Sequence, residues 1–358
     1  MSDLRYLIGS ISPFSIMGAA AFLRQKGLSP DSSGVFHFEH STPVIAQCEQ
    51  WLTQVLGLHY LGELGAIEPA AKRVAGRFPF LPAFKSRWRR WGGERLHLNP
   101  DAIEHLILPY RPVLADALLC NLFPNAQIHF VADGLSMGFS QTLTLPLYWR
   151  LTGIRNPFDG RTQQAIWTLA RLGNAMSTLG KPQVVGEEHF NEVITTVCDH
   201  EQFRQWVNKN IPAVGDGHFS FLLLQILDSK LVDLKDEAMV WAGIICEELL
   251  SHEDTILVKP HPRDYEDKLA QIQFLIPPDE HTRVRFLPLD AIGALPVEIF
   301  GKVLPIRSLV GLCSTALLTG DQSGEMQVRA YRSSLLPDSL NEIIDRCAVA
   351  GGFPVKSL

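Results

Sequence analysis

The fold is decided by the stretch Arg5-Tyr6-Leu7-Ile8-Gly9-Ser10-Ile11-Ser12-Pro13 near the start of the chain. Its first half is a short apolar run that ends at a glycine, which is typical of a buried strand. A Gly/Ser/Pro loop and a helical pattern over residues 14–26 follow it. A short strand that passes through a tight loop into a helix is the first half of a βαβ unit, so the stretch predicts a parallel sheet.

The same alternation continues through the first half of the chain. We expect strands at residues 34–39, 104–108 and 127–132, and helices at 43–56 and 112–122. The helix at 43–56 follows two residues that favour helix N-termini, Ser41 and Thr42. Residues 141–210 have a helical pattern and no clear strand.

A second α/β half follows a turn-rich segment at residues 208–218. We expect its strands at 219–227, 255–259, 284–287 and 309–312, and helices at 235–251 and 340–348. The pattern predicts two Rossmann-like domains, residues 1–212 and 213–358, whose parallel sheets face a central cleft. The closing helix, at 340–348, has two expected positions: in the second domain, or packed back on the N-terminal domain. Ligands of such sheets bind beyond the carboxyl ends of the strands.

The composition excludes several classes of protein. With 46% hydrophobic and 20% charged residues, the chain of 358 residues is a globular protein. A net charge of −6 argues against a nucleic-acid partner. We see no apolar run near the ~20 residues that span a bilayer and no signal segment. The six cysteines form no CxxC pair and suit free thiols, so we expect a cytoplasmic protein.

The most distinctive local motif is Lys259-Pro260-His261-Pro262-Arg263, which follows an apolar run. The prolines fix φ on both sides of the histidine. A stiff loop of this kind presents an imidazole, flanked by two cations, where it can hold or protonate an anionic leaving group. A rigid turn with a solvated histidine explains the motif equally well.

Three weaker motifs also stand at expected strand ends or in apolar surroundings. Ser314 and Thr315 lie where a strand passes into a helix and suit either an anion site or simple N-capping. Asp133-Gly134 is either a general base beside a tight turn or an ordinary turn. Glu298 is a single acid in an apolar run, either an exposed helix residue or an acceptor of ribose hydroxyls.

Taken in order along the chain, these motifs resemble those of bacterial sialyltransferases and polysialyltransferases. The acidic-Gly, His-Pro and Ser-Ser/Thr motifs of these enzymes match Asp133-Gly134, His261-Pro262 and Ser314-Thr315, and Glu298 resembles their ribose-binding acid. Many members have two acids before the glycine, whereas Ala132 precedes Asp133 here. The resemblance covers about residues 4–27, 127–136 and 219–320.

The resemblance implies a GT-B fold and an inverting, metal-independent glycosyltransferase that moves sialic acid from CMP-sialic acid to a hydroxyl of a surface glycan, such as a lipooligosaccharide or capsule. Asp133 would deprotonate the acceptor, and His261 would stabilise or protonate the departing CMP. Lys259, Pro262, Glu298, Ser314 and Thr315 would bind the donor, and the acceptor side would include Gly134, Ser10 and Ser12. We expect no cofactor and no metal, because the phosphate can be held by protein groups alone and no DxD pair is evident in the sequence.

Two alternatives remain open on the sequence. The donor could be CMP-Kdo or CDP-glycerol, whose enzymes can share a His-Pro loop. The chain could also be a catalytically silent GT-B-like subunit that binds glycans.

Residues 72–95 are unusually basic and aromatic for a chain of net charge −6. This basic segment has three interpretations: a peripheral contact with anionic lipid at the inner face of the membrane, a groove for a polyanionic sugar chain, or a surface insertion whose aromatic residues pack on the first domain. The partners expected overall are a nucleotide-sugar donor and a glycan or glycolipid acceptor.

Overall fold

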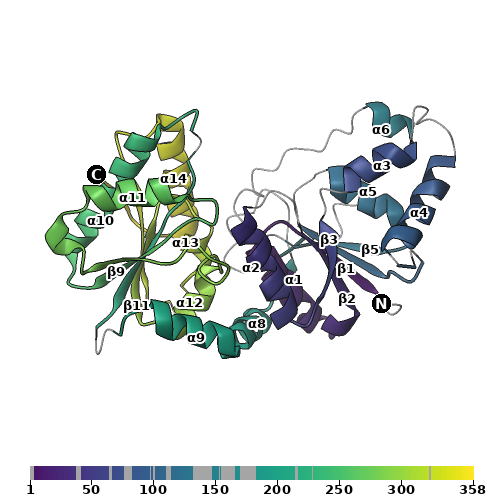
Figure 1. Cartoon of the computed structure of the whole chain (residues 1–358), viewed down its shortest axis with the longest axis horizontal. Helices are drawn as coiled ribbons and strands as arrows, with labels where there is room; N and C mark the ends of the chain where they lie inside the picture. The colour runs from purple at the N-terminus through teal and green to yellow at the C-terminus, as the bar shows by residue number, and fades with distance from the viewer. Residues whose placement is uncertain are drawn as a thin grey trace. The chain divides into compact units, whose positions relative to one another are not determined.

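The structure is a computed structural model of the chain (Figure 1). It describes residues 4–37, 42–63, 67–75, 83–96, 98–99, 101–109, 114–131, 147–152, 154, 166–169, 183–213, 217–227, 229–321 and 324–358. These residues fall into two compact units. The first comprises residues 1–41 and 49–196, and the second comprises 42–48 and 197–358. The predicted domain boundary at 212/213 falls between the last helix before the second sheet and the first strand of that sheet.

The first unit is built on a parallel sheet in which seven of the described strands have the order β3-β2-β1-β4-β5-β6-β7. The strands are β1 (Tyr6–Ser10), β2 (Ser33–His37), β3 (His59–Glu63), β4 (His105–Pro109), β5 (Gln127–Val131), β6 (Ile166–Leu169) and β7 (Gln183–Val185). The order changes direction between β1 and β4, so the carboxyl ends of these two central strands mark the edge where a ligand is expected.

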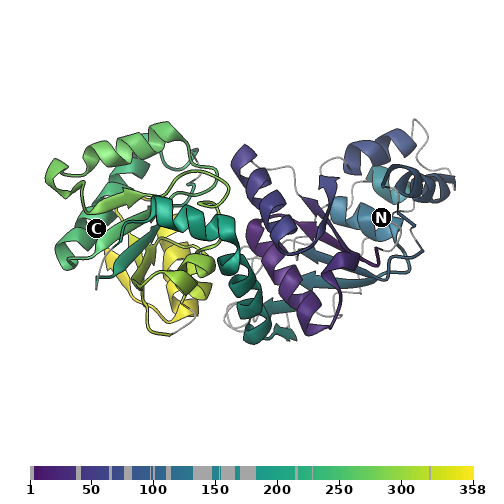
Figure 2. The ribbon, with the colours of Figure 1, turned by 60° about the horizontal axis from the view of Figure 1, so that its bottom comes forward.

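Helices cover both faces of this sheet. They are α1 (Pro13–Gln25), α2 (Pro43–Val55), α3 (Ile67–Ala75), α4 (Ala83–Leu96), α5 (Leu114–Leu122), α6 (Leu147–Leu151) and α8 (Glu187–Asp199). Figures 1 and 2 show α1 and α2 on one face of the sheet and α4 and α5 on the other. Helix α1 begins as the sequence dictates, because Ser12 and Ser15 form a capping box and Pro13 takes the first helical position.

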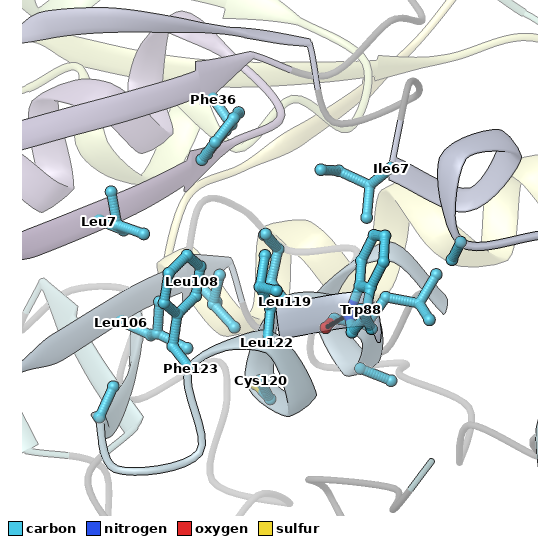
Figure 3. Close-up of a cluster of buried hydrophobic side chains, with 14 of the residues drawn as sticks. Leu7, Phe36, Ile67, Trp88, Leu106, Leu108, Leu119, Cys120, Leu122 and Phe123 are labelled. Atoms are coloured by element: carbon cyan, nitrogen blue, oxygen red, sulfur yellow. Dashed lines mark hydrogen bonds between the residues drawn. The ribbon is translucent and has the colours of Figure 1, made fainter. Parts of the chain in front are cut away.

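A hydrophobic core lies between α3, α4, α5 and the sheet (Figure 3). Trp88 of α4 is fully buried there, and its indole N–H donates to the carbonyl oxygen of Leu118, 3.1 Å away. The Trp88 ring stacks with Phe84, at 6.2 Å between ring centroids, and with Trp91, at 4.6 Å. The aromatic residues of α4 that the structure describes therefore pack inward.

The second unit has a parallel sheet of six described strands in the order β10-β9-β8-β11-β12-β13. The strands are β8 (Phe219–Leu223), β9 (Thr255–Lys259), β10 (Val284–Phe286), β11 (Ile306–Gly311), β12 (Gln327–Arg332) and β13 (Val355–Ser357). The helices are α9 (Glu201–Asn210), α10 (Leu234–Ser251), α11 (Glu266–Leu275), α12 (Val297–Val303), α13 (Ala316–Thr319) and α14 (Asp338–Gly351). Helix α14 packs on β12 and β13 in this unit.

The expected fold class, two Rossmann-like α/β units with parallel sheets, is confirmed. The expectation that residues 141–210 contain no strand was wrong, because β6 and β7 lie there: β6 pairs with β5, and β7 pairs with β6. These strands have four and three residues, too few for an alternating pattern to emerge from the sequence. The run expected as a strand at 219–227 ends its sheet pairing at Leu223.

Candidate functional site

The predicted donor residues lie at the carboxyl edge of the second sheet. Strands β9 and β11 flank β8, and all three run parallel, so the loops that follow them leave the same edge. The His-Pro loop (residues 260–264) follows β9, and the Ser-Thr loop (residues 312–315) follows β11. The fold therefore brings together two motifs that are 53 positions apart, counted from His261 to Ser314.

Lys259 is a buried cation at the end of β9. It is 7% exposed, and its ammonium forms no hydrogen bond or ion pair within the described ranges. Burial lowers the pKa of Lys259 to about 8, and the nearby Glu298 and Asp264 carboxylates partly oppose that shift. A buried ammonium without a direct partner is costly, so its position favours an anionic ligand.

The His261 ring is held in one orientation by its own loop. The backbone N–H of Arg263 donates to Nδ1 at 3.1 Å, so we assign the ring hydrogen to Nε2. Burial, followed by the positive charges of Lys259 and Arg263, lowers the pKa of His261 to about 3. The imidazole is therefore neutral at pH 7 and offers one N–H donor.

Glu298 lies in the first turn of α12 and is 2% exposed. Its Oε1 accepts a hydrogen bond from the Thr319 hydroxyl, while Oε2 accepts none from the part of the chain that the structure describes. Burial raises the pKa of Glu298, and the Thr319 hydrogen bond opposes that shift. The interpretation as an exposed helix residue is wrong, because the helix directs this acid inward. A buried oxygen without a donor suits a hydroxyl ligand.

The Ser-Thr loop is joined to Glu298 through Thr319, whose hydroxyl lies 3.2 Å from the Thr315 carbonyl oxygen. Ser314 Oγ accepts from the Ala316 backbone N–H at 3.2 Å, which is local capping. Helix α13 has only four residues, too few to act as an anion site by its N-terminus alone. The polar groups offered to a ligand here are therefore those of the Ser-Thr loop. Both Ser314 and Thr315 are half-buried.

On the first unit, Ser10 is the last residue of β1, and Ser12 lies in the short loop that joins β1 to α1. Ser10 is fully buried, and its hydroxyl contacts Ser15 Oγ at 2.9 Å and Glu49 Oε1 at 3.2 Å. Ser12 caps α1 by accepting from the Ser15 backbone N–H. Both serines organise the first βα loop, and their contact with an acceptor stays a prediction. Asp133 and Gly134 lie outside the described residues, as does Ala132; β5 ends at Val131.

Sequence reasoning missed a buried acid in this unit. Glu49 of α2 is 1% exposed, its Oε2 lies 3.7 Å from His37 Nδ1, and burial raises its pKa to about 8. Burial lowers the pKa of His37 to about 4, so both groups are uncharged at pH 7. A single acid in an amphipathic helix does not indicate a buried site from the sequence alone. Glu49 is buried because it packs against the ends of β1 and β2, at Ser10 and His37.

The basic segment is divided between the surface and the core. Phe84 and Trp88 are fully buried, whereas Lys85, Arg87 and Arg90 are exposed on α4. Its described aromatic residues therefore pack on the first unit, as the third interpretation expected. The exposed cations remain available to an anionic partner.

Within the described part of the chain, no group of three or more His, Cys, Asp or Glu side chains is placed to hold a metal ion. No described helix is long and apolar enough to cross a bilayer.

Comparison with solved structures defines the fold. A sialyltransferase from Photobacterium damselae, crystallised as its GT-B domain, is 11% identical with a TM-score of 0.50, and 98% of each chain is covered. An alpha/beta-galactoside alpha-2,3-sialyltransferase from Photobacterium phosphoreum is 10% identical with a TM-score of 0.51, over 98% of this chain and 97% of that one. A UDP-GlcNAc 2-epimerase from Neisseria meningitidis reaches a TM-score of 0.51 at 10% identity, over 91% and 82% of the two chains. The molecule therefore has the GT-B fold, which transferases and epimerases share.

The family is shown by sequence. The alpha-2,8-polysialyltransferase (POLYST) model matches residues 114–323, and the chain belongs to that family. The match spans Asp133, Lys259, His261, Glu298 and Ser314. No curated protein matches the chain. The sialyltransferase resemblance is thereby confirmed: the protein is a glycosyltransferase of the sialyl-transferring kind, and its family implies a nucleotide-sugar donor and a glycan acceptor.

Proposed function

We propose that the protein transfers sialic acid from CMP-sialic acid to a hydroxyl of a surface glycan, with inversion at the anomeric carbon and without a metal ion. The observation that carries this proposal is the arrangement beyond β9. There the Lys259 ammonium, buried and without a direct partner among the described residues, ends β9, and the His261 ring with its Nε2–H follows two positions later in the stiff His-Pro loop. This combination suits the single phosphate of CMP.

The donor would be held by separate groups with separate tasks. Lys259 supplies the positive charge, and the neutral His261 ring donates a hydrogen bond from Nε2 to a phosphate oxygen. Because the pKa of His261 is about 3, it acts as a hydrogen-bond donor more readily than as a proton donor. Glu298 Oε2, which has no donor among the described residues, would accept a hydrogen bond from a ribose hydroxyl, and Ser314 and Thr315 would complete the phosphate site.

The reaction would be a direct displacement. The acceptor oxygen attacks the anomeric carbon while the bond to the CMP phosphate oxygen breaks, through a transition state with oxocarbenium character. The hydroxyl proton passes to Asp133, and the electron pair of the broken bond leaves with CMP. The family description, alpha-2,8-polysialyltransferase, favours a sialic acid residue as the acceptor.

A CMP-release assay with purified protein tests this function. We expect CMP release from CMP-sialic acid to increase at least about tenfold when a sialylated oligosaccharide is added, because acceptor attack is the productive step. Release from CMP-Kdo, or turnover of CDP-glycerol, in place of CMP-sialic acid would identify one of the alternative donors. Binding of the glycan with no turnover of any of the three donors would establish the silent subunit instead.

We further propose that the exposed cations of the basic segment contact an anionic surface beside the acceptor, either membrane lipid at the inner face or the polyanionic glycan itself. The support is that Lys85, Arg87 and Arg90 are exposed on one helix while its neighbouring aromatic residues are buried. Such a contact would keep a cytoplasmic enzyme peripheral to the membrane by charge alone.

A further inference from the structure

A buried lysine outside the predicted site ties three backbone segments of the second unit together. Lys268 of α11 is 1% exposed, and its ammonium donates to Asp264 Oδ1 at 2.7 Å and to the Gln225 carbonyl oxygen at 2.9 Å. Its third neighbour is the Glu237 carboxylate of α10, with an ion-pair distance of 2.5 Å. Asp264 belongs to the His-Pro loop, and Gln225 belongs to the loop after β8.

Two of these partners, Asp264 and Gln225, in turn hold a loop backbone. Asp264 Oδ2 accepts from the backbone N–H of His261 at 2.7 Å, and the Asp264 N–H donates back to the His261 carbonyl oxygen at 2.8 Å. The Gln225 side chain accepts from the backbone N–H of Cys313 at 2.8 Å. Cys313 immediately precedes Ser314, so a continuous polar path joins the His-Pro loop to the Ser-Thr loop.

We propose that Asp264, Lys268 and Gln225 form a positioning network that sets the His-Pro loop and the Ser-Thr loop relative to each other so that both reach the donor phosphate. The inference rests on the proposed function, because it takes the two loops as the donor phosphate site. None of the three residues contacts the reacting atoms in this scheme, so each is a positioning residue and not a catalytic one.

The network is better suited to positioning than to stability. A buried ion pair is often no more stabilising than apolar side chains of the same volume, because both charges lose their hydration. Two of the backbone groups that the network satisfies, the His261 and Cys313 N–H groups, belong to the two motif loops. The network therefore fixes the backbone of the two loops that are proposed to bind the donor phosphate. Precise placement matters there, because a displacement of about 1 Å can reduce the rate of a reaction about 100-fold.

Gln225→Leu is the informative variant. It conserves the approximate volume and removes only the contacts of the Gln225 amide with Cys313, namely the acceptor of the Cys313 N–H and the Nε2 donor that faces Cys313 Sγ at 3.8 Å. Lys268→Met, by contrast, leaves two buried carboxylates without their cation and endangers folding. We expect the CMP dissociation constant of Gln225→Leu to increase about tenfold, the effect of losing one partly buried hydrogen bond. The dissociation constant for cytidine, which lacks the phosphate, should stay within about twofold. Calorimetric titration with CMP and cytidine measures both.

Two further variants complete the experiment. Gln271→Leu makes the same chemical change on the exposed face of α11 and should leave both affinities unchanged. Asp264→Asn weakens the network from its other end and should reproduce the CMP-selective loss. Equal weakening of CMP and cytidine in Gln225→Leu, or no weakening of either, would overturn the network. If the wild type binds no CMP at all, the proposed function itself fails, which is a separate outcome.

Discussion

Lys259 has an unusual environment for a lysine side chain. It is nearly excluded from water, yet it has no direct hydrogen-bond or ion-pair partner within the residues that the structure describes. Its pKa of about 8, lowered by burial, leaves it mostly protonated at neutral pH. A bound phosphate would supply the missing counter-charge and favour the protonated form, so donor binding and the protonation of Lys259 are coupled.

This coupling predicts the pH dependence of donor affinity. The folded-state pKa of Lys259 is lowered, so the ammonium is present below about pH 8 and is lost as pH rises through that value. We expect the donor KM to be constant from pH 6 to about 7 and to increase above about pH 8. Lys259→Met should increase KM about tenfold or more at pH 7 and remove the dependence, because a charged hydrogen bond is lost.

Lys259→Arg is the matched control for this prediction. A guanidinium stays charged across the same range, so its KM should not increase between pH 8 and 9.5. His261 has a pKa of about 3 and does not titrate in this interval, so it does not contribute to the change of KM with pH. A wild-type KM that stays flat to pH 9.5 would contradict the role of Lys259.

At the scale of single elements, local sequence predicted the parts of the site that depend on local chemistry. Strand β9 runs over Thr255–Lys259, as expected, because its apolar run ends at a proline that cannot continue the sheet. The His-Pro loop was recognisable for the same reason. Gln225 was not recognised as part of the site. The available signal was that it is a polar residue inside the apolar run at 219–227.

The remaining elements could not be predicted because their stability comes from neighbours. β3, β12 and β13 are set by pairing across the sheet, and β13 has only three residues. The spacing of Asp264 and Lys268 would suit an i,i+4 ion pair on any exposed helix. Its burial, and hence its bearing on the two loops, depends on α10 packing against α11.

Helix α4 gives a prediction at the element scale. Because Phe84 and Trp88 are occupied in the core, any contact of this helix with an anionic surface must rely on charge. We expect co-sedimentation with phosphatidylserine-containing vesicles at low ionic strength and its loss at about 0.5 M NaCl, where the Debye length is only about 4 Å. The triple change Lys85→Glu, Arg87→Glu and Arg90→Glu should abolish it without changing Tm.

A triple variant of equal charge change on the second unit, Lys209→Glu, Lys235→Glu and Arg285→Glu, controls for net charge. It should retain most of the vesicle binding, because these exposed residues lie outside α4. No binding of the wild type at low salt would discard the membrane contact and leave the polyanionic glycan as the partner to test.

At the scale of the whole molecule, the proposed chemistry is divided between the two units. The donor residues Lys259, His261, Glu298, Ser314 and Thr315 all belong to the second unit, and the proposed base, Asp133, belongs to the first. Binding of the nucleotide and activation of the acceptor should therefore respond to different substitutions. A catalytically silent relative would lose the activation of the acceptor and keep the binding of the nucleotide.

Asp133→Ala and His261→Ala test this division. Asp133→Ala should reduce transfer at least about 100-fold, the usual contribution of a general base, while the CMP dissociation constant stays within about twofold. His261→Ala should reduce transfer and also weaken CMP about tenfold, because one phosphate hydrogen bond is lost in both the ground state and the transition state. Transfer rates measured by CMP release, together with calorimetric CMP titration, separate the two patterns.

Full transfer activity in Asp133→Ala would exclude Asp133 as the base. Since Ala132 occupies the place of a second acid, that result would direct the search to Glu49, the buried acid that lies 3.2 Å from Ser10 at the end of β1.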